Sequence, residues 1–297
     1  MGNTCVFRST AISIPEGDAR TALLERLAEL SIDGGSSGEL RDYVAADLDR
    51  FMYTLGLVPE GAQGLGLEIG ANPYFMSVIM RDFRPHLRFE YVNFFDGAGD
   101  SVDQSVRWRS KDGDVREEHF VSLNRNLEVD SLPVEEKRYD VILFCEVLEH
   151  FTQDPLRCVS ELRRVLKDGG LLVLTTPNVA RFENVAALID GRNLYDPYSG
   201  YGPHGRHNRE YTRHELHMLM RHAGFACKFD FTSDVHPNIP SSIASEHVVE
   251  ALQRIQHREH DLGQYLFSCW VKADDGLGNE RPLPRWLYRS YPEHRFE

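Results

Sequence analysis

The chain has 297 residues, of which 41% are hydrophobic and 27% charged, a balance typical of a folded globular protein rather than a disordered one. Its 46 acidic and 33 basic residues give a net charge of −13, which disfavours binding to nucleic-acid phosphates and to anionic membranes. Five scattered cysteines without a C-x-x-C pair, and no apolar run of membrane-spanning length, predict a cytoplasmic protein with reduced thiols.

The first 60 residues are expected to form a helical cap. Leucines at helical spacing predict a helix over residues 16–31, which a Gly- and Ser-rich loop ends at 33–38. A second amphipathic helix follows and stops at Gly56 and Pro59. This pair of helices precedes the part of the chain in which strands and helices alternate.

Residues 61–273 alternate between strand and helix patterns, which is typical of a largely parallel sheet. A hairpin insertion is expected at 104–121, a substrate loop at 191–211 and an irregular C-terminal extension at 274–297. The predicted strands are 64–70, 87–95, 139–144, 171–175, 225–231 and 264–272, and the predicted helices are 73–83, 155–166, 213–223 and 243–260.

The turn after the first of these strands is a candidate ligand site. It reads Glu68-Ile69-Gly70-Ala71-Asn72-Pro73, and its glycine lets the backbone turn tightly and approach a ligand. The helix that follows directs its N–H groups toward the same place. Taken alone, the turn fits an ordinary connection between a strand and a helix better than a ligand site, because only one of the usual glycines is present.

A second segment, residues 139–178, decides between these interpretations. It reads YDVILFCEVLEHFTQDPLRCVSELRRVLKDGGLLVLTTPN and resembles the central part of class I S-adenosylmethionine-dependent methyltransferases. With the upstream turn, the resemblance extends from about residue 64 to about residue 231. It implies an α/β Rossmann-like, doubly wound fold, with a seven-stranded, mostly parallel sheet and an N-terminal helical addition. It also implies S-adenosyl-L-methionine as the cofactor.

The resemblance implies cofactor contacts at the carboxyl ends of the strands. The family's first motif has more glycines than this chain, where Ala71, Asn72 and Pro73 follow Gly70. Asn93 stands where an acidic residue usually holds the ribose hydroxyls, and Asp96 is the alternative. The expected cofactor-binding residues are Glu68, Gly70, Ala71, Asn72, Asn93, Asn126, Leu127, Cys145 and Glu146.

Three histidines are candidate catalytic bases. His150 follows the predicted strand 139–144, and His204 and His207 lie in the substrate loop. Histidine is a suitable base because the imidazole side chain titrates near neutral pH. Since His150 belongs to the general family pattern, a structural hydrogen bond is its alternative role. The spacing of His204, His207 and Glu210 matches no dedicated metal motif, so no metal site is expected.

The resemblance implies a methyltransferase that moves a methyl group to a hydroxyl of a small polar metabolite, a sugar or secondary metabolite, by in-line displacement. N- or C-methylation of a small molecule, and a methyltransferase-like binding domain without catalysis, remain the alternatives. A nicotinamide dehydrogenase is disfavoured because G-x-G-x-x-G is absent. The expected partner is a small-molecule acceptor, without nucleic acid or membrane, and a homodimer is compatible with the sequence.

Overall fold

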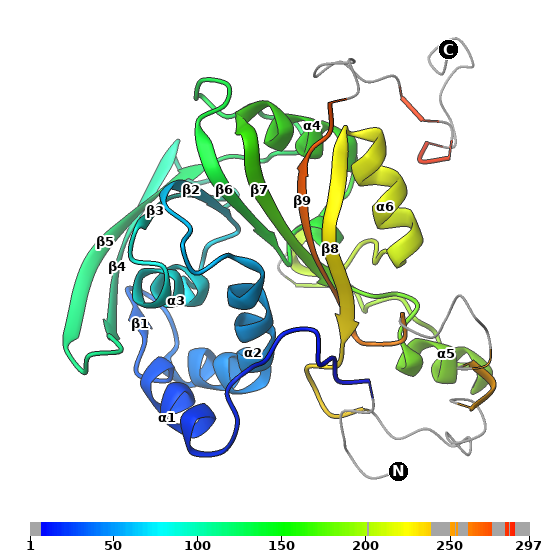
Figure 1. Cartoon of the computed structure of the whole chain (residues 1–297), viewed down its shortest axis with the longest axis horizontal. Coiled ribbons are helices and arrows are strands. Elements are labelled where there is room, and N and C mark those ends of the chain that lie inside the picture. Colours follow the sequence, from blue (N-terminus) through cyan, green and yellow to red (C-terminus); the bar gives the residue numbers. More distant parts are fainter. Residues whose placement is uncertain are drawn as a thin grey trace.

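The computed structural model describes residues 7–200, 202–238, 250–252, 254, 261–274, 283–284 and 286–288. Within this part of the chain, one mixed sheet of nine strands runs in the order β1-β4-β5-β3-β2-β6-β7-β9-β8, as Figure 1 shows. The strands are β1 (Ser31–Ile32), β2 (Gly64–Ile69), β3 (Leu87–Asn93), β4 (Ser101–Arg109), β5 (Val115–Asn124), β6 (Tyr139–Cys145), β7 (Leu166–Pro177), β8 (Phe225–Ser233) and β9 (Tyr265–Lys272).

Helices cover both faces of the sheet. The α-helices are α1 (Gly17–Leu27), α2 (Ser37–Leu57), α3 (Phe75–Phe83), α4 (Pro155–Val165), α5 (Phe182–Ile189) and α6 (Arg213–His222), and two short 3₁₀ turns are η1 (Leu148–His150) and η2 (Pro203–Gly205). None of the helices in the described ranges is long and apolar enough to cross a membrane. Because parallel strands connected through helices share one direction, their carboxyl ends gather at one edge of the sheet.

The predicted seven-stranded core is present as β5-β3-β2-β6-β7-β9-β8, in which only β9 runs antiparallel to its neighbours. The sheet has more than the seven predicted strands because the predicted hairpin is part of the sheet instead of a separate insertion. Its second strand, β5, pairs parallel with β3, and its first strand, β4, extends the edge. The two-residue strand β1 then pairs with β4.

Strand β6 shows how the sequence divides the core into two layers. Val141 and Leu143 pack with the helices α1, α2 and α3, whereas Ile142 and Phe144 pack with α4 and α6. This alternation follows from the two-residue period of a strand, which points successive side chains to opposite faces. A run of consecutive apolar residues is therefore what a strand buried on both faces requires.

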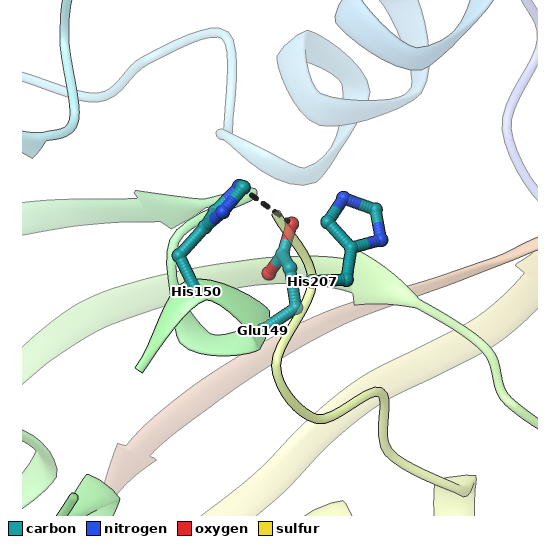
Figure 2. Close-up of side chains that lie close together, drawn as sticks. All are labelled: Glu149, His150 and His207. Atoms are coloured by element: carbon teal, nitrogen blue, oxygen red, sulfur yellow. Dashed lines mark ion pairs between the residues drawn. The ribbon is translucent and has the colours of Figure 1, made fainter. Parts of the chain in front are cut away.

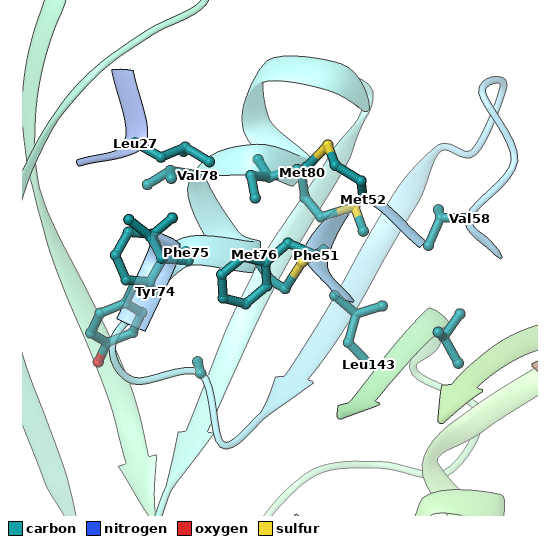
Figure 3. Close-up of a cluster of buried hydrophobic side chains, with 14 of the residues drawn as sticks. Leu27, Phe51, Met52, Val58, Tyr74, Phe75, Met76, Val78, Met80 and Leu143 are labelled. Atoms are coloured by element: carbon teal, nitrogen blue, oxygen red, sulfur yellow. The ribbon is translucent and has the colours of Figure 1, made fainter. Parts of the chain in front are cut away.

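The predicted N-terminal helical cap is held against the sheet by α2. Ser36 caps this helix by accepting a hydrogen bond from the Glu39 backbone N–H. Figure 3 shows side chains of α2, among them Phe51, beside Phe75 of α3 and Leu143 of β6. This packing brings one face of α2 next to the turn that follows β2.

Three features differ from the sequence-based expectations or lie beyond them. The first predicted helix ends early, at Leu27, and the chain then forms β1. Helix α5 was not predicted. The predicted helix 243–260 and the extension 274–297 fall largely outside the described residues, and the proposed domain boundaries remain a prediction.

Candidate functional site

A pocket of about 300 Å³ opens at the carboxyl ends of β2, β3 and β6. Its volume lies at the lower end of the range usual for small-molecule sites. The lining combines apolar and polar side chains: Ile69, Gly70, Asn72, Val92, Asn93, Phe94, Phe95, Arg125, Asn126, Leu127, Glu146, Val147, His150, Phe151 and His204. Six of the nine predicted cofactor residues line it.

Gly70 forms the floor of the turn after β2. Its φ of +69° lies in the left-handed region, and a Cβ added there would meet the Val147 side chain at 2.6 Å. Both facts require glycine, because any other residue would be strained and would push against the pocket wall. Because position 70 has no side chain, the backbone of the turn lines the pocket directly. This arrangement fits an extended ligand that lies across the turn.

The predicted asparagines lie around the pocket but are partly engaged with the protein. Asn93 is buried, accepts a hydrogen bond from the Asn72 backbone N–H at 3.0 Å and donates to the Tyr74 hydroxyl at 3.2 Å. Asn126 lines the pocket and accepts from the Glu128 backbone N–H. The alternative to Asn93, Asp96, is exposed and does not line the pocket.

The other predicted cofactor residues lie around a small cavity beneath the turn, of about 30 Å³. Glu68 is buried, accepts a hydrogen bond from the Ser77 hydroxyl at 2.6 Å, and burial raises its pKa to about 8. Ala71 and Cys145 line the same cavity, and burial raises the pKa of the Cys145 thiol to about 12. That thiol is therefore a neutral packing group rather than a nucleophile.

Arg50 of α2 lines this small cavity opposite Glu68, although nothing in the sequence singled it out. Its guanidinium is buried, donates to Asp47 at 2.7 Å and to the Tyr43 hydroxyl at 2.7 Å. Burial opposes the charge, but Tyr43, Glu146 and Asp47 outweigh it and raise the Arg50 pKa well above its ordinary value. A permanent cation therefore lies beside the Gly70 turn.

Glu146 directly follows β6 and has an unusual backbone conformation. Its φ is +54°, a region that non-glycine residues rarely adopt and that tends to occur at functional sites. The carboxylate accepts a hydrogen bond from the Thr175 hydroxyl at 2.7 Å and lines the 300 Å³ pocket. Burial, which is the largest cause, raises its pKa.

Glu149, His150 and His207 lie together beside the pocket, as Figure 2 shows. One ligand atom from each lies within 4.8 Å of the others, and the two imidazole rings meet edge to face with centroids 5.1 Å apart. Glu149 is fully buried and accepts a hydrogen bond from the Thr176 hydroxyl at 3.0 Å through Oε2, whereas its Oε1 has no hydrogen-bond partner in the part of the chain that the structure describes. Burial, followed by the charge of Glu146, raises the Glu149 pKa to about 8.

Hydrogen bonds fix the orientation of both imidazoles. His150 Nδ1 lies 3.0 Å from the Arg206 carbonyl oxygen, which can only accept, so this nitrogen carries the proton. His207 Nδ1 lies 3.1 Å from the Glu210 carboxylate. In the neutral form of each ring, Nε2 is the nitrogen left with a lone pair. The chain also ties the two segments together, since the Asn208 and Arg209 backbone N–H groups donate to the Glu149 carbonyl.

The pKa values of the two imidazoles are shifted in opposite directions. Burial, helped by the charge of His207, lowers the pKa of His150 and keeps it neutral near pH 7. Burial also opposes the charge of His207, but Glu210 and Glu149 outweigh it and raise the pKa of His207. His150 is therefore the better proton acceptor of the two near neutral pH.

His204, the third predicted catalytic histidine, lines the same pocket as His150. Its ring packs edge to face on Phe94, with centroids 5.2 Å apart. Its Nδ1 lies 4.0 Å from the buried carboxylate of Glu128, which also accepts the Thr152 backbone N–H at 2.8 Å. His204 thus lines the pocket with His150 but is not a member of the cluster Glu149, His150 and His207.

A second pocket, of about 470 Å³, lies on the other side of the segment that carries His207. It is lined by residues from α5, the predicted substrate loop and the start of α6: Val179, Leu188, Asn193, Leu194, Tyr195, Asp196, His207, Asn208, Arg209, Glu210 and Glu215. His150 lines the first pocket and His207 the second. The cluster therefore lies at the junction of the two.

Sequence reasoning missed Glu149, although it selected the neighbours Glu146 and His150. The signal was the Glu-Val-Leu-Glu-His segment, in which Glu149 directly precedes His150 within the short 3₁₀ turn η1. The partner His207 comes from 57 positions further on, and no local pattern joins it to η1. Arg50 was missed as a site residue for the same reason, whereas Glu210 was considered as a metal ligand and set aside.

The model of a methyltransferase domain matches residues 42–228, more than half of the chain. The ubiquinone biosynthesis O-methyltransferase of Cereibacter sphaeroides is 34% identical over 100 residues, which is 34% of this chain and 39% of that protein. The match thus spans about two fifths of the curated relative.

Solved structures with a similar fold include a possible histamine N-methyltransferase from Thermotoga maritima, at 18% identity and a TM-score of 0.48, covering 79% of this chain and 95% of that one. The N-methyltransferase NodS from Bradyrhizobium japonicum, solved with S-adenosyl-L-homocysteine, has 15% identity and a TM-score of 0.45, covering 86% and 99%. The family match and the pocket at the Gly70 turn agree with the resemblance carried by residues 139–178. The chain belongs to the class I S-adenosylmethionine-dependent methyltransferases.

Proposed function

We propose that the chain transfers a methyl group from S-adenosylmethionine to a hydroxyl oxygen of a small polar acceptor, such as a sugar or a secondary metabolite. The observation that carries this proposal is the cluster Glu149, His150 and His207 at the junction of two pockets. One pocket takes the cofactor and the other the acceptor. A hydroxyl placed at the junction meets groups that can remove or polarise its proton.

The residues around the Gly70 turn fit the cofactor. The pocket at the ends of β2 and β3 takes the adenosine end, between Asn93 and Leu127, and the turn itself takes the methionine end. We assign Arg50 to the methionine carboxylate, since a buried cation next to the turn pairs with an anion. The bound cofactor supplies a methyl group on a sulfonium that is already activated for transfer.

Positioning is the main task of the protein in this reaction. Holding two reactants in line can contribute roughly 7–11 kcal/mol to lowering the barrier. The acceptor pocket provides hydrogen-bonding groups for this purpose, among them Tyr195, Asp196, Arg209 and Glu215. Its volume of about 470 Å³ suits a small molecule.

The hydroxyl acceptor is favoured over an amine by the state of His150. An unprotonated amine already has a free lone pair, whereas a hydroxyl must lose its proton during transfer. His150 presents Nε2 without a proton, and its lowered pKa keeps it so near pH 7. N- or C-methylation, and binding without catalysis, remain the alternatives that experiment separates.

Incubation of the full chain with S-adenosylmethionine and a panel of phenols, sugars and amines tests the proposal. Mass spectrometry should show a methyl group added to hydroxyl-bearing compounds, and nuclear magnetic resonance should place it on oxygen. Methylation only of amines would contradict the choice of acceptor. Binding of cofactor without methylation of any compound class would favour the non-catalytic alternative.

A further inference from the structure

We propose that Glu149, His150 and His207 bind a divalent transition-metal ion at the junction of the cofactor and acceptor pockets. This departs from the expectation that the chain has no metal site. It deepens the proposed function, on which its catalytic role rests, because the ion would receive the acceptor hydroxyl. The binding site itself stands on geometry that is independent of the reaction.

The first argument is the state of Glu149. Its side chain is fully buried, and its Oε1 has no hydrogen-bond partner among the described residues. An unsatisfied buried polar atom costs about 1–3 kcal/mol, and more when the group is charged. Oε1 lies 3.9 Å from His150 Nε2, so it faces the other members of the cluster. A cation bound there would satisfy the carboxylate.

The second argument is that hydrogen bonds already orient the two imidazole rings. Metal-binding histidines usually donate their other N–H to a carbonyl or a carboxylate, which fixes the tautomer and the ring orientation. His150 has such a bond to the Arg206 carbonyl, and His207 has one to Glu210. Glu210 is itself held by an ion pair with Arg181. Both rings thus offer Nε2 as a ligand atom.

The third argument compares this cluster with another group of similar composition. His217, Cys227 and Asp230 also lie within bonding distance of one ion. There, however, Asp230 is paired with both Arg213 and His217, and its side-chain oxygens are satisfied. A cation would have to displace an arginine from that group. At Glu149 the oxygen that would bind the ion has no hydrogen-bond partner to displace within the described ranges.

The ligand set indicates the kind of ion. Two imidazole nitrogens and one carboxylate suit Mn²⁺, Fe²⁺, Co²⁺ or Zn²⁺, whereas Mg²⁺ and Ca²⁺ prefer oxygen ligands alone. Three protein ligands leave coordination positions open, as in catalytic rather than structural sites. The nearby carboxylate of Glu146 adds negative potential to the same region.

The position of the ion gives it a role in the proposed reaction. An acceptor hydroxyl that reaches an open coordination position would have its pKa lowered, as metal-bound water does. Its proton then passes to water, the oxygen forms a bond to the methyl carbon, and the bond from sulfur to that carbon breaks, leaving S-adenosylhomocysteine. When the ion is bound, the two imidazoles hold it and water takes the proton; in the metal-free chain, His150 keeps its role as the proton acceptor.

Titration of the metal-stripped full chain with Co²⁺ tests the site, followed by calorimetry and by the visible absorption of the ion. We expect one tightly bound ion per chain. Glu149→Gln, which keeps the shape and the bond to Thr176, and His207→Asn should each weaken binding by about tenfold or more. His217→Asn, in the comparison group, should leave it unchanged.

Two results would overturn the proposal: no stoichiometric binding at about millimolar Co²⁺, or equal binding by wild type and Glu149→Gln. The second would show attachment to surface histidines, all of which Glu149→Gln retains. If this variant does not fold, His207→Asn decides, since His207 lies on a half-buried loop. S-adenosylhomocysteine binding, measured on the same samples, separates the two hypotheses. Wild-type protein that binds S-adenosylhomocysteine but no Co²⁺ would refute the metal site alone, and wild-type protein that binds no S-adenosylhomocysteine would refute the proposed function.

Discussion

The substitution Gly70→Ala should both destabilise the fold and weaken cofactor binding. Alanine at a φ of +69° costs about 1–2 kcal/mol because of its left-handed backbone. The new Cβ would lie 2.6 Å from Val147 Cγ2, against an ordinary contact of about 3.5–4.0 Å, and such overpacking costs about 1–3 kcal/mol. Alanine also lowers the conformational entropy of the unfolded chain, and this offsets about 0.4–1 kcal/mol of the destabilisation. The free energy of unfolding should therefore fall by about 2–4 kcal/mol.

Val147 is a pocket-lining residue, so its displacement transmits the strain to the ligand. We expect the affinity for S-adenosylhomocysteine to fall by about tenfold or more, which corresponds to 1.4 kcal/mol of the strain. Isothermal calorimetry measures the affinity, and urea unfolding measures the stability.

Gly113→Ala is the matched control for this substitution. Gly113 has a φ of +90° at the hairpin tip and no atom within 4 Å of an added Cβ. The free energy of unfolding of the control should fall only by the cost of the left-handed backbone conformation, and its affinity for S-adenosylhomocysteine should not change. A folded Gly70→Ala protein that binds S-adenosylhomocysteine as tightly as wild type would refute the placement of the cofactor over this turn.

Three further predictions follow from the same structure. Arg50→Met should weaken S-adenosylhomocysteine binding by about tenfold or more while adenosine binding changes little, because only the former carries the carboxylate; equal weakening of both would contradict the assignment. His150→Ala should lower kcat more than it weakens cofactor binding, measured by steady-state kinetics and calorimetry, and an equal loss would favour a structural role. Burial opposes the charge on Asp230, but His217 and Arg213 outweigh it and hold its pKa far below the ordinary value. Its ionised form therefore contributes stability above about pH 4 that is lost as the pH falls further. Asp230→Asn should cost about 2 kcal/mol at pH 7 and less at pH 3 in urea unfolding; a cost independent of pH would contradict this.

The layers of the fold could be predicted because their signals are local. The apolar run at 139–144 and the stripe at 155–166 each specify an element and the face that it buries. The pairing of β5 with β3 could not be predicted, because a hairpin signal gives the turn but not the neighbour that the second strand finds. Strand β1 has only two residues, too few to carry a period.

The site residues also fall into those that the sequence predicts and those that it does not. Gly70 and Glu146 are readable from the family pattern, and both have the positive φ that a special backbone position implies. Glu149 gains its importance from burial and from a missing hydrogen-bond partner, which only three-dimensional packing determines. His207 joins it through a loop whose backbone N–H groups bind the Glu149 carbonyl, and no sequence period predicts such a contact.

Calorimetric titration of the wild-type chain with S-adenosylhomocysteine tests the central claim most directly. The account predicts one binding site per chain with a dissociation constant in the micromolar range, on the order of −8 kcal/mol. The absence of any binding heat at about millimolar ligand, in a sample shown to be folded, would contradict it.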